Sequence, residues 1–121
     1  MIVLEFPAPT DAWSINQERK MHWTEARQIA REWRLAGKLG WRMLPIGERE
    51  AWEPRRCEVE ITLPVKDGRR RDPMNWFGPV KSLIDGLVDG GVWPDDTPEW
   101  VRVVEPVLNV GGPVRIVLRP I

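Results

Sequence analysis

The segment 57–63 alternates strictly between apolar and polar side chains and constrains the fold more than any other stretch. Side chains of a β-strand point to opposite faces with a period of two. The pattern therefore predicts a strand whose apolar residues, Cys57, Val59, Ile61 and Leu63, face a hydrophobic core.

A helix is predicted to follow this strand, starting near Pro79. Its apolar residues recur at spacings of three and four, which places them on one helical face; they are Val80, Leu83, Ile84, Leu87 and Val88. Gly90-Gly91 supplies the left-handed residue that commonly ends a helix.

The N-terminal half repeats this strand-then-helix order. Residues 2–6 predict a short strand, and residues 16–22 a polar, basic loop. Thr24 is a plausible N-cap for a helix that ends near residue 40. Its apolar face comprises Trp23, Ala26, Ala30, Trp33 and Gly37. Residues 41–54 are predicted to be a loop that covers an edge of the core with Trp41, Met43, Leu44 and Ile46.

Two β-branched runs complete the chain, Val101–Val107 and Val114–Leu118, and the Gly-rich link between them predicts an antiparallel hairpin. The order is therefore β-α-β-α-β-β. We expect one α+β domain over residues 1–121, a two-layer sandwich with two helices packed on a mixed four-stranded sheet.

Composition excludes several classes of protein. The chain has 121 residues with 18 basic and 18 acidic side chains, so any affinity for nucleic acid must come from local clustering of charge. Cys57 is the only cysteine, which excludes an internal disulfide and favours a buried thiol. No apolar run is long enough to span a membrane and no signal-peptide pattern is present, so we expect a soluble, cytoplasmic protein.

Charged residues gather between Arg69 and Asp96. Three arginines, Arg69, Arg70 and Arg71, directly precede Asp72, and the pair Asp95-Asp96 follows the predicted helix. Carboxylates bind Mg²⁺, and neighbouring cations stabilise the charge that develops on a phosphodiester during hydrolysis. A metal site is one interpretation of these acids.

Purely structural interpretations stay open for the same residues. Asp72 before Pro73 is also typical of a helix N-cap, and Asp95-Asp96 lies in a turn-forming sequence. Lys81 and Asp85 are four residues apart, as in a surface ion pair on a helix.

The ordered motif resembles one known family. The motif comprises Arg70-Arg71-Asp72 with Asn75, Lys81 with Asp85 and Leu87, and Gly91-Val92-Trp93-Pro94-Asp95-Asp96. It is similar to the RusA family of Holliday-junction resolvases, small and often phage-borne endonucleases of DNA recombination and repair. The likeness extends more weakly to the opening strand and to residues 16–23.

The resemblance implies a homodimeric, Mg²⁺-dependent endodeoxyribonuclease that resolves four-way DNA junctions by paired nicks, with Mn²⁺ as an alternative metal and no organic cofactor. By motif position, Asp72, Lys81 and Asp96 would be catalytic, and Asp72, Asp95 and Asp96 would bind the metal. Met74 stands where the family's prototype has another acid. Either Asn75 supplies a neutral oxygen ligand instead, or the site holds one metal more weakly.

The DNA-binding surface is expected to consist of basic residues, namely Arg69, Arg70, Arg71, Arg19, Lys20, Arg55 and Arg56. His22 either faces the DNA, or supports the ligands of the metal from behind, or is a structural residue beside Trp23. Two rival functions stay open: a catalytically impaired protein that binds branched DNA, which Met74 motivates, and a dimeric DNA-binding adaptor in which Asp72 and Asp96 only cap and turn.

Overall fold

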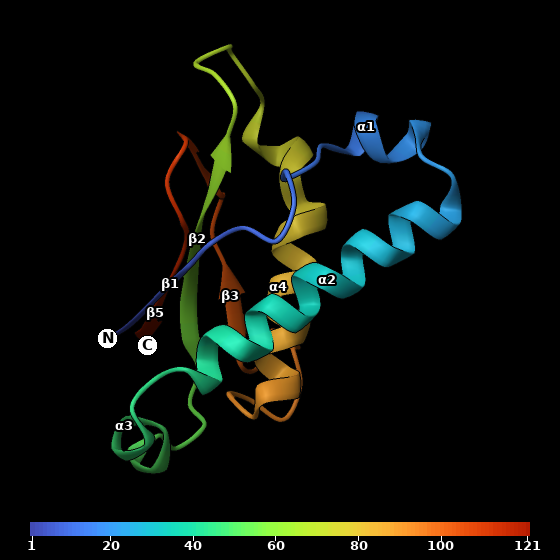
Figure 1. The fold of residues 1–121 in the computed structure, drawn as a ribbon. Helices are drawn as coiled ribbons and strands as arrows, with labels where there is room; N and C mark the ends of the chain where they lie inside the picture. Colours follow the sequence, from blue (N-terminus) through green and yellow to red (C-terminus); the bar gives the residue numbers. More distant parts are fainter.

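A computed structural model describes residues 1–121 and has the predicted order of main elements (Figure 1). The strands are β1 (Ile2–Phe6), β2 (Cys57–Val65), β3 (Val101–Val103), β4 (Val107–Val110) and β5 (Val114–Pro120). The helices are α1 (Ile15–Lys20), α2 (Trp23–Arg42), α3 (Ile46–Ala51), the 3₁₀ helix η1 (Pro73–Trp76) and α4 (Phe77–Gly90).

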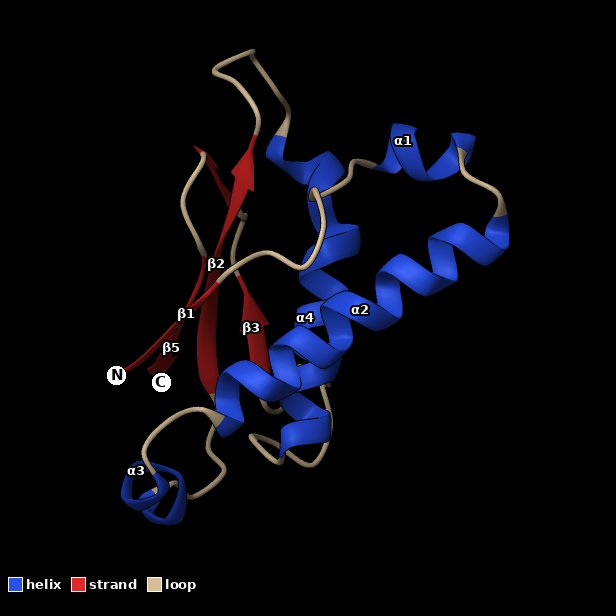
Figure 2. Cartoon of the chain, viewed as in Figure 1, coloured by secondary structure: helices blue, strands red, loops and turns tan.

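The fold is α+β, with α2 and α4 packed together against a mixed five-stranded sheet (Figure 2). The sheet order is β1-β5-β2-β3, and β4 also pairs with β2, farther along the same edge. The five strands therefore fill four positions, because β3 and β4 together occupy the place of one interrupted strand. No helix combines the length and the apolar character needed to cross a membrane.

The predicted hairpin between residues 101–107 and 114–118 is wrong. β3 and β4 pair with β2 in parallel, whereas β5 pairs with β2 antiparallel from its other side. The glycines Gly111 and Gly112 have positive φ angles of 68° and 82°, and the Gly111 N–H donates to the carbonyl of Val65. The turn therefore carries the chain over the end of β2, and β2 separates the two expected partners.

The hydrophobic core lies between the sheet and the two long helices. The four predicted inward residues of β2 are at most 1% exposed. Four of the five residues of the predicted α4 stripe are buried, and Val88 packs against them partly exposed. Gly91 ends α4 in the left-handed conformation, as predicted. Cys57 is a buried free thiol, also as predicted.

The boundaries of α2 differ from the prediction. His22, rather than Thr24, caps the helix, which continues through Gly40 to Arg42. Trp23 is 62% exposed and does not belong to the buried face. Its position in the first turn, where α2 extends away from the sheet towards α1, explains the difference (Figure 1).

Two short helices occupy segments predicted to be loops. Ser14 and Gln17 form a reciprocal capping box that starts α1, and α3 lies within residues 41–54. In that segment Trp41 is buried and Leu44 packs against the core, but Met43 and Ile46 are exposed.

Candidate functional site

Lys81 joins two parts of the charged motif. Its Nζ donates to Oδ1 of Asp85, one helical turn farther along α4, at 2.8 Å, and to Oδ2 of Asp96 in the loop that follows the helix. The contact with Asp85 raises the pKa of Lys81, and the contact with Lys81 lowers the pKa of Asp96. The ammonium group thus stays protonated between two carboxylates, although the lysine side chain is 62% exposed.

Asp95 orients the loop that carries Asp96. Its Oδ1 accepts the backbone N–H of Asp96 at 2.7 Å. The side chain of Asp95 is exposed and forms no ion pair. The pair itself lies in an irregular part of the loop. The turn follows at residues 98–100, where the N–H groups of Trp100 and Val101 donate to the carbonyl of Thr97.

Asp72 caps the 3₁₀ helix η1. Its Oδ1 accepts the backbone N–H of Met74 at 3.0 Å, and Pro73 is the first residue of the helix. The capping interpretation is therefore confirmed. Asp72 is exposed and has no ion-pair partner, so its second carboxylate oxygen remains free. Asn75 is half-buried, and its side chain makes no hydrogen bond within the protein.

The predicted metal ligands are not gathered into a ready-made cluster, because no three His, Cys, Asp or Glu side chains are grouped to hold an ion. Mg²⁺ commonly uses only one or two carboxylates and completes its shell with water and substrate phosphate. Asp72, the cap of η1, and Asp96, in the loop after α4, are oxygen donors of this type. They do not form a carboxylate cage with a third acid.

The three consecutive arginines belong to a loop organised by Asp67, a residue that the sequence analysis did not single out. The Asp67 carboxylate accepts the backbone N–H of Arg69 at 3.0 Å and the guanidinium groups of Arg69 and Arg71 at 3.2 and 3.0 Å. These contacts, first the Arg69 N–H, lower the pKa of Asp67 to about 2. Only Arg70 is without an ion-pair or side-chain hydrogen-bond partner. Asp67 precedes Arg69 by two residues and Arg71 by four. This spacing was the signal in the sequence that could have predicted the role of Asp67 in the loop.

The predicted basic surface is divided between the two ends of β2. Arg55 and Arg56 precede the strand, whereas Arg69–Arg71 follow it, and nine residues of strand span about 30 Å. Arg55 lies over the Trp52 ring, and Arg56 donates to the carbonyl of Pro98. They are therefore not continuous with the arginine loop within one chain.

Two other predicted basic residues lie in the last turn of α1, which Figure 1 shows at the same end of the molecule as η1. Arg19 and Lys20 are exposed there and form no ion pair. His22 accepts the N–H of Thr24 through Nδ1 at 3.2 Å, with its ring centroid 5.7 Å from that of Trp23. His22 therefore has a structural role beside Trp23, as the N-cap of α2 that the sequence had assigned to Thr24.

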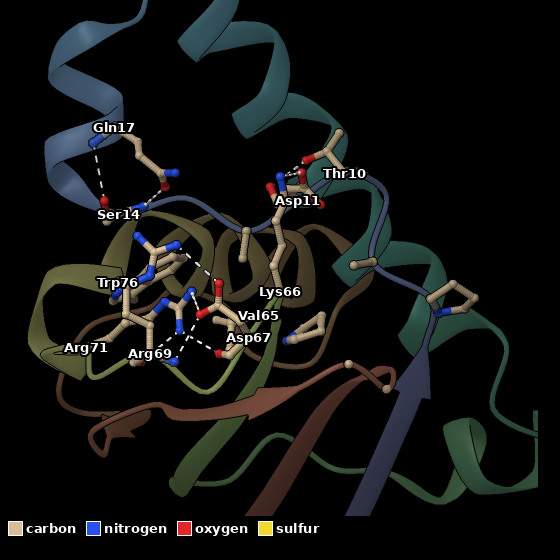
Figure 3. Close-up of a pocket in the computed structure, with 16 residues that line it drawn as sticks. Thr10, Asp11, Ser14, Gln17, Val65, Lys66, Asp67, Arg69, Arg71 and Trp76 are labelled. Carbon is tan, nitrogen blue, oxygen red and sulfur yellow. Dashed lines mark hydrogen bonds and ion pairs between the residues drawn. The ribbon is translucent and has the colours of Figure 1, made fainter.

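A pocket of about 870 Å³ opens beside the arginine loop (Figure 3). The N-terminal segment 7–17 forms one side, and the end of β2 with the arginine loop forms another. Trp76 and the Gly111-Gly112 turn complete the lining. Sequence patterns had no means of revealing this pocket, because it joins segments about 50 to 100 residues apart.

Comparison with known proteins adds no assignment: no family model matches the chain, and no curated protein matches it.

Proposed function

We propose that this chain is a Mg²⁺-dependent endodeoxyribonuclease that nicks four-way DNA junctions, acting as a cytoplasmic homodimer. The observation that carries the proposal is the contact of Lys81 with Asp96. These residues are fifteen positions apart, and they are the lysine and the acid of the motif that resembles the RusA family. The exposed Arg70 and the basic end of α1 support binding of phosphates nearby.

The side chains of this site suit phosphodiester hydrolysis. Lys81 is an exposed ammonium group that its two carboxylates keep charged, so it can donate to a non-bridging phosphate oxygen as negative charge develops. Asp72 and Asp96, with Asp95 and Asn75 adjacent, would hold Mg²⁺. The bound ion would supply Lewis-acid polarisation of the phosphodiester.

A synthetic four-way junction with one labelled strand in each arm tests the proposal. Wild-type protein with Mg²⁺ or Mn²⁺ is expected to yield symmetrically nicked duplexes. Asp96→Asn and Lys81→Met should each lower the cutting rate at least a hundredfold, within the range attributed to single electrostatic groups. Asp89→Asn is the matched control. It also removes a carboxylate of α4, but Asp89 pairs with Arg34 and not with Lys81. Intact junctions after incubation of the folded wild-type dimer with either metal would refute the proposal.

Asp72 allows capping to be separated from chemistry. Asparagine caps helices as well as aspartate does, so Asp72→Asn keeps the bond to Met74 and removes the charge. We expect this variant to fold with near wild-type stability, to bind junctions and to fail to cut them. Unchanged cutting by Asp72→Asn would show that this acid only caps η1 and takes no part in the chemistry.

A catalytically impaired branched-DNA-binding protein is the second candidate, and Met74 favours it. This side chain is 59% exposed and offers no oxygen ligand where the family's prototype has an acid. The second candidate predicts tight, salt-sensitive binding of junctions without cleavage under any metal. Met74→Asp should then restore cutting, whereas an active wild type excludes this candidate.

The homodimer is proposed to bury an exposed apolar face of α2. Leu35, Leu39 and Met43 recur every four residues, which places them along one helical face, and they are 53%, 47% and 80% exposed. Such a stripe is complementary to itself when a second copy packs antiparallel about a two-fold axis, with Leu35 opposite Met43. Leu39→Lys should give a monomer in light scattering. A dimer that withstands this change contradicts the assignment of the face.

A further inference from the structure

The pocket beside the arginine loop has features that the proposed cutting site does not use. Its volume of about 870 Å³ lies within the range of pockets that hold small molecules. Lys81, Asp85 and Asp96 do not line it, whereas Lys66, Arg69 and Arg71 do. It is thus a concave site with its own basic groups.

One basic group of the pocket, Arg71, is held in place, whereas Lys66 and Arg69 form ion pairs with their side chains 77% exposed. Arg71 donates from Nη1 to the carbonyls of Asp67 and Arg69 at 2.7 and 2.9 Å, and its side chain is only 15% exposed. Lys66 pairs with Asp11 across the mouth at 3.1 Å (Figure 3). Three cations face two carboxylates, so the lining keeps one net positive charge and favours an anion.

Uncharged groups of the lining suit the other parts of a nucleotide. Trp76 is only 8% exposed and lies beside Arg71, whose guanidinium carbon is 5.9 Å from the ring centroid. Its indole N–H donates to no acceptor within the protein and is not fully buried, so the ring offers the pocket this donor edge. The backbone N–H of Gly112 likewise has no protein partner. Two N–H donors without a protein partner can donate hydrogen bonds to the acceptors of a base, and the fixed Arg71 guanidinium can bind a phosphate. Cations that follow the backbone are typical of single-strand binding sites.

We infer that this pocket binds one nucleotide of an unpaired DNA strand, with its phosphate at Lys66, Arg69 and Arg71 and its base towards Trp76. A duplex is convex and presents its phosphates on the outside, so it does not enter a concave pocket of this size. A strand that leaves the duplex at a branch point can enter. The inference rests on the proposed function for the source of such a strand.

Nuclear magnetic resonance of the tryptophan indole groups provides a local test, because each of the eight rings gives its own signal. The probe is single-stranded dodecathymidylate. We expect a saturable shift of the Trp76 signal and none at Trp100, which does not line the pocket. The duplex of dodecathymidylate with dodecaadenylate should leave Trp76 unshifted.

Matched variants assign the binding to the pocket. Arg69→Gln should weaken binding of the single strand about tenfold or more, since hydrogen bonds to charged groups are the strong ones. Arg70→Gln removes a charge from the same loop but not from the lining, and it should have a smaller effect. Equal loss in the two variants would overturn the inference. A Trp76 signal that shifts with the duplex as much as with the single strand would also overturn the inference.

Two outcomes separate this inference from the proposed function. A protein that cuts junctions while its Trp76 signal ignores the single strand refutes the pocket assignment alone. A shifting Trp76 signal in a protein that cuts no junction supports the pocket and refutes the nuclease. If thymidine monophosphate binds as tightly as the oligonucleotide, the pocket is a site for free nucleotides. That result would overturn the inference that it binds a DNA strand.

Discussion

The contact between α2 and α4 can be tested by adding one methyl group. Gly86 of α4 faces the backbone of α2, where a Cβ atom would overlap the carbonyl oxygen of Arg34 and lie 2.9 Å from the Lys38 nitrogen. Both atoms belong to helical backbone and cannot rotate away. Gly86→Ala must therefore push the two helices apart.

The expected cost follows from two opposing effects. Alanine is about 1 kcal/mol better than glycine in a helix interior. Overpacking a core costs about 1–3 kcal/mol, and the upper part of that range applies here because backbone meets backbone and the neighbours Leu83, Leu87 and Trp33 are fully buried. We expect Gly86→Ala to lower the free energy of unfolding by about 2 kcal/mol.

Gly47→Ala is the matched control. This glycine lies inside the helix α3, has no positive φ angle, and has nothing within 4 Å of an added Cβ. The change should leave stability unaltered or raise it by up to about 1 kcal/mol. The two substitutions are chemically identical and should differ in sign.

Urea denaturation followed by tryptophan fluorescence measures both variants. Similar slopes against urea would show that the change lies in stability rather than in the denatured state. A Gly86→Ala protein as stable as wild type would refute the packing argument. Because α4 also carries Lys81, the destabilised variant should cut junctions more slowly if the proposed function holds.

Three further predictions concern single side chains. The signal of the Asp67 carboxyl carbon should titrate near pH 2 rather than near the ordinary pKa of 3.8. The contacts of this carboxylate therefore stabilise the protein fully above pH 3.8 and are lost as the pH falls through about 2. A titration midpoint near 3.8 would contradict the loop structure. Cys57, buried with its pKa raised by that burial, should resist a thiol reagent in the native protein and react fully in urea, and rapid native labelling would show that it is accessible. Arg70→Ala should reduce the slope of log binding constant against log salt by about one for duplex DNA, and an unchanged slope would remove this arginine from the phosphate contacts.

The elements with strong local periodicity were predictable from the sequence. The alternation of β2 and the stripe of α4 each depend on side-chain spacing within one segment. The pairing of β5 with β2 was not predictable in this way, because strand pairing depends on residues about sixty positions apart. The helices α1 and α3 have six residues each, too few for a clear period. For α1, the Ser14-to-Gln17 capping box was a readable signal.

In the candidate site, too, contacts within one segment were predictable and contacts between segments were not. The spacing of Lys81 and Asp85 predicts their ion pair within one helix, and Asp72 before Pro73 predicts the cap. The contact of Lys81 with Asp96 depends on how the following loop returns along α4, so only a family resemblance could suggest that these residues act together. The role of Asp67 was readable from its spacing to the arginines and was missed.

The position of β5 has a consequence for the order in which this chain can fold during synthesis. β1 pairs only with β5, and the register joins Ile2 to Leu118. The first strand therefore cannot pair until a strand more than a hundred residues later has been translated. The segment between β1 and β5, which must close into a loop, is among the longest that the chain allows. We expect α2, α4, β2 and β3 to associate first and β1 to be added last, with β5, as the slow step.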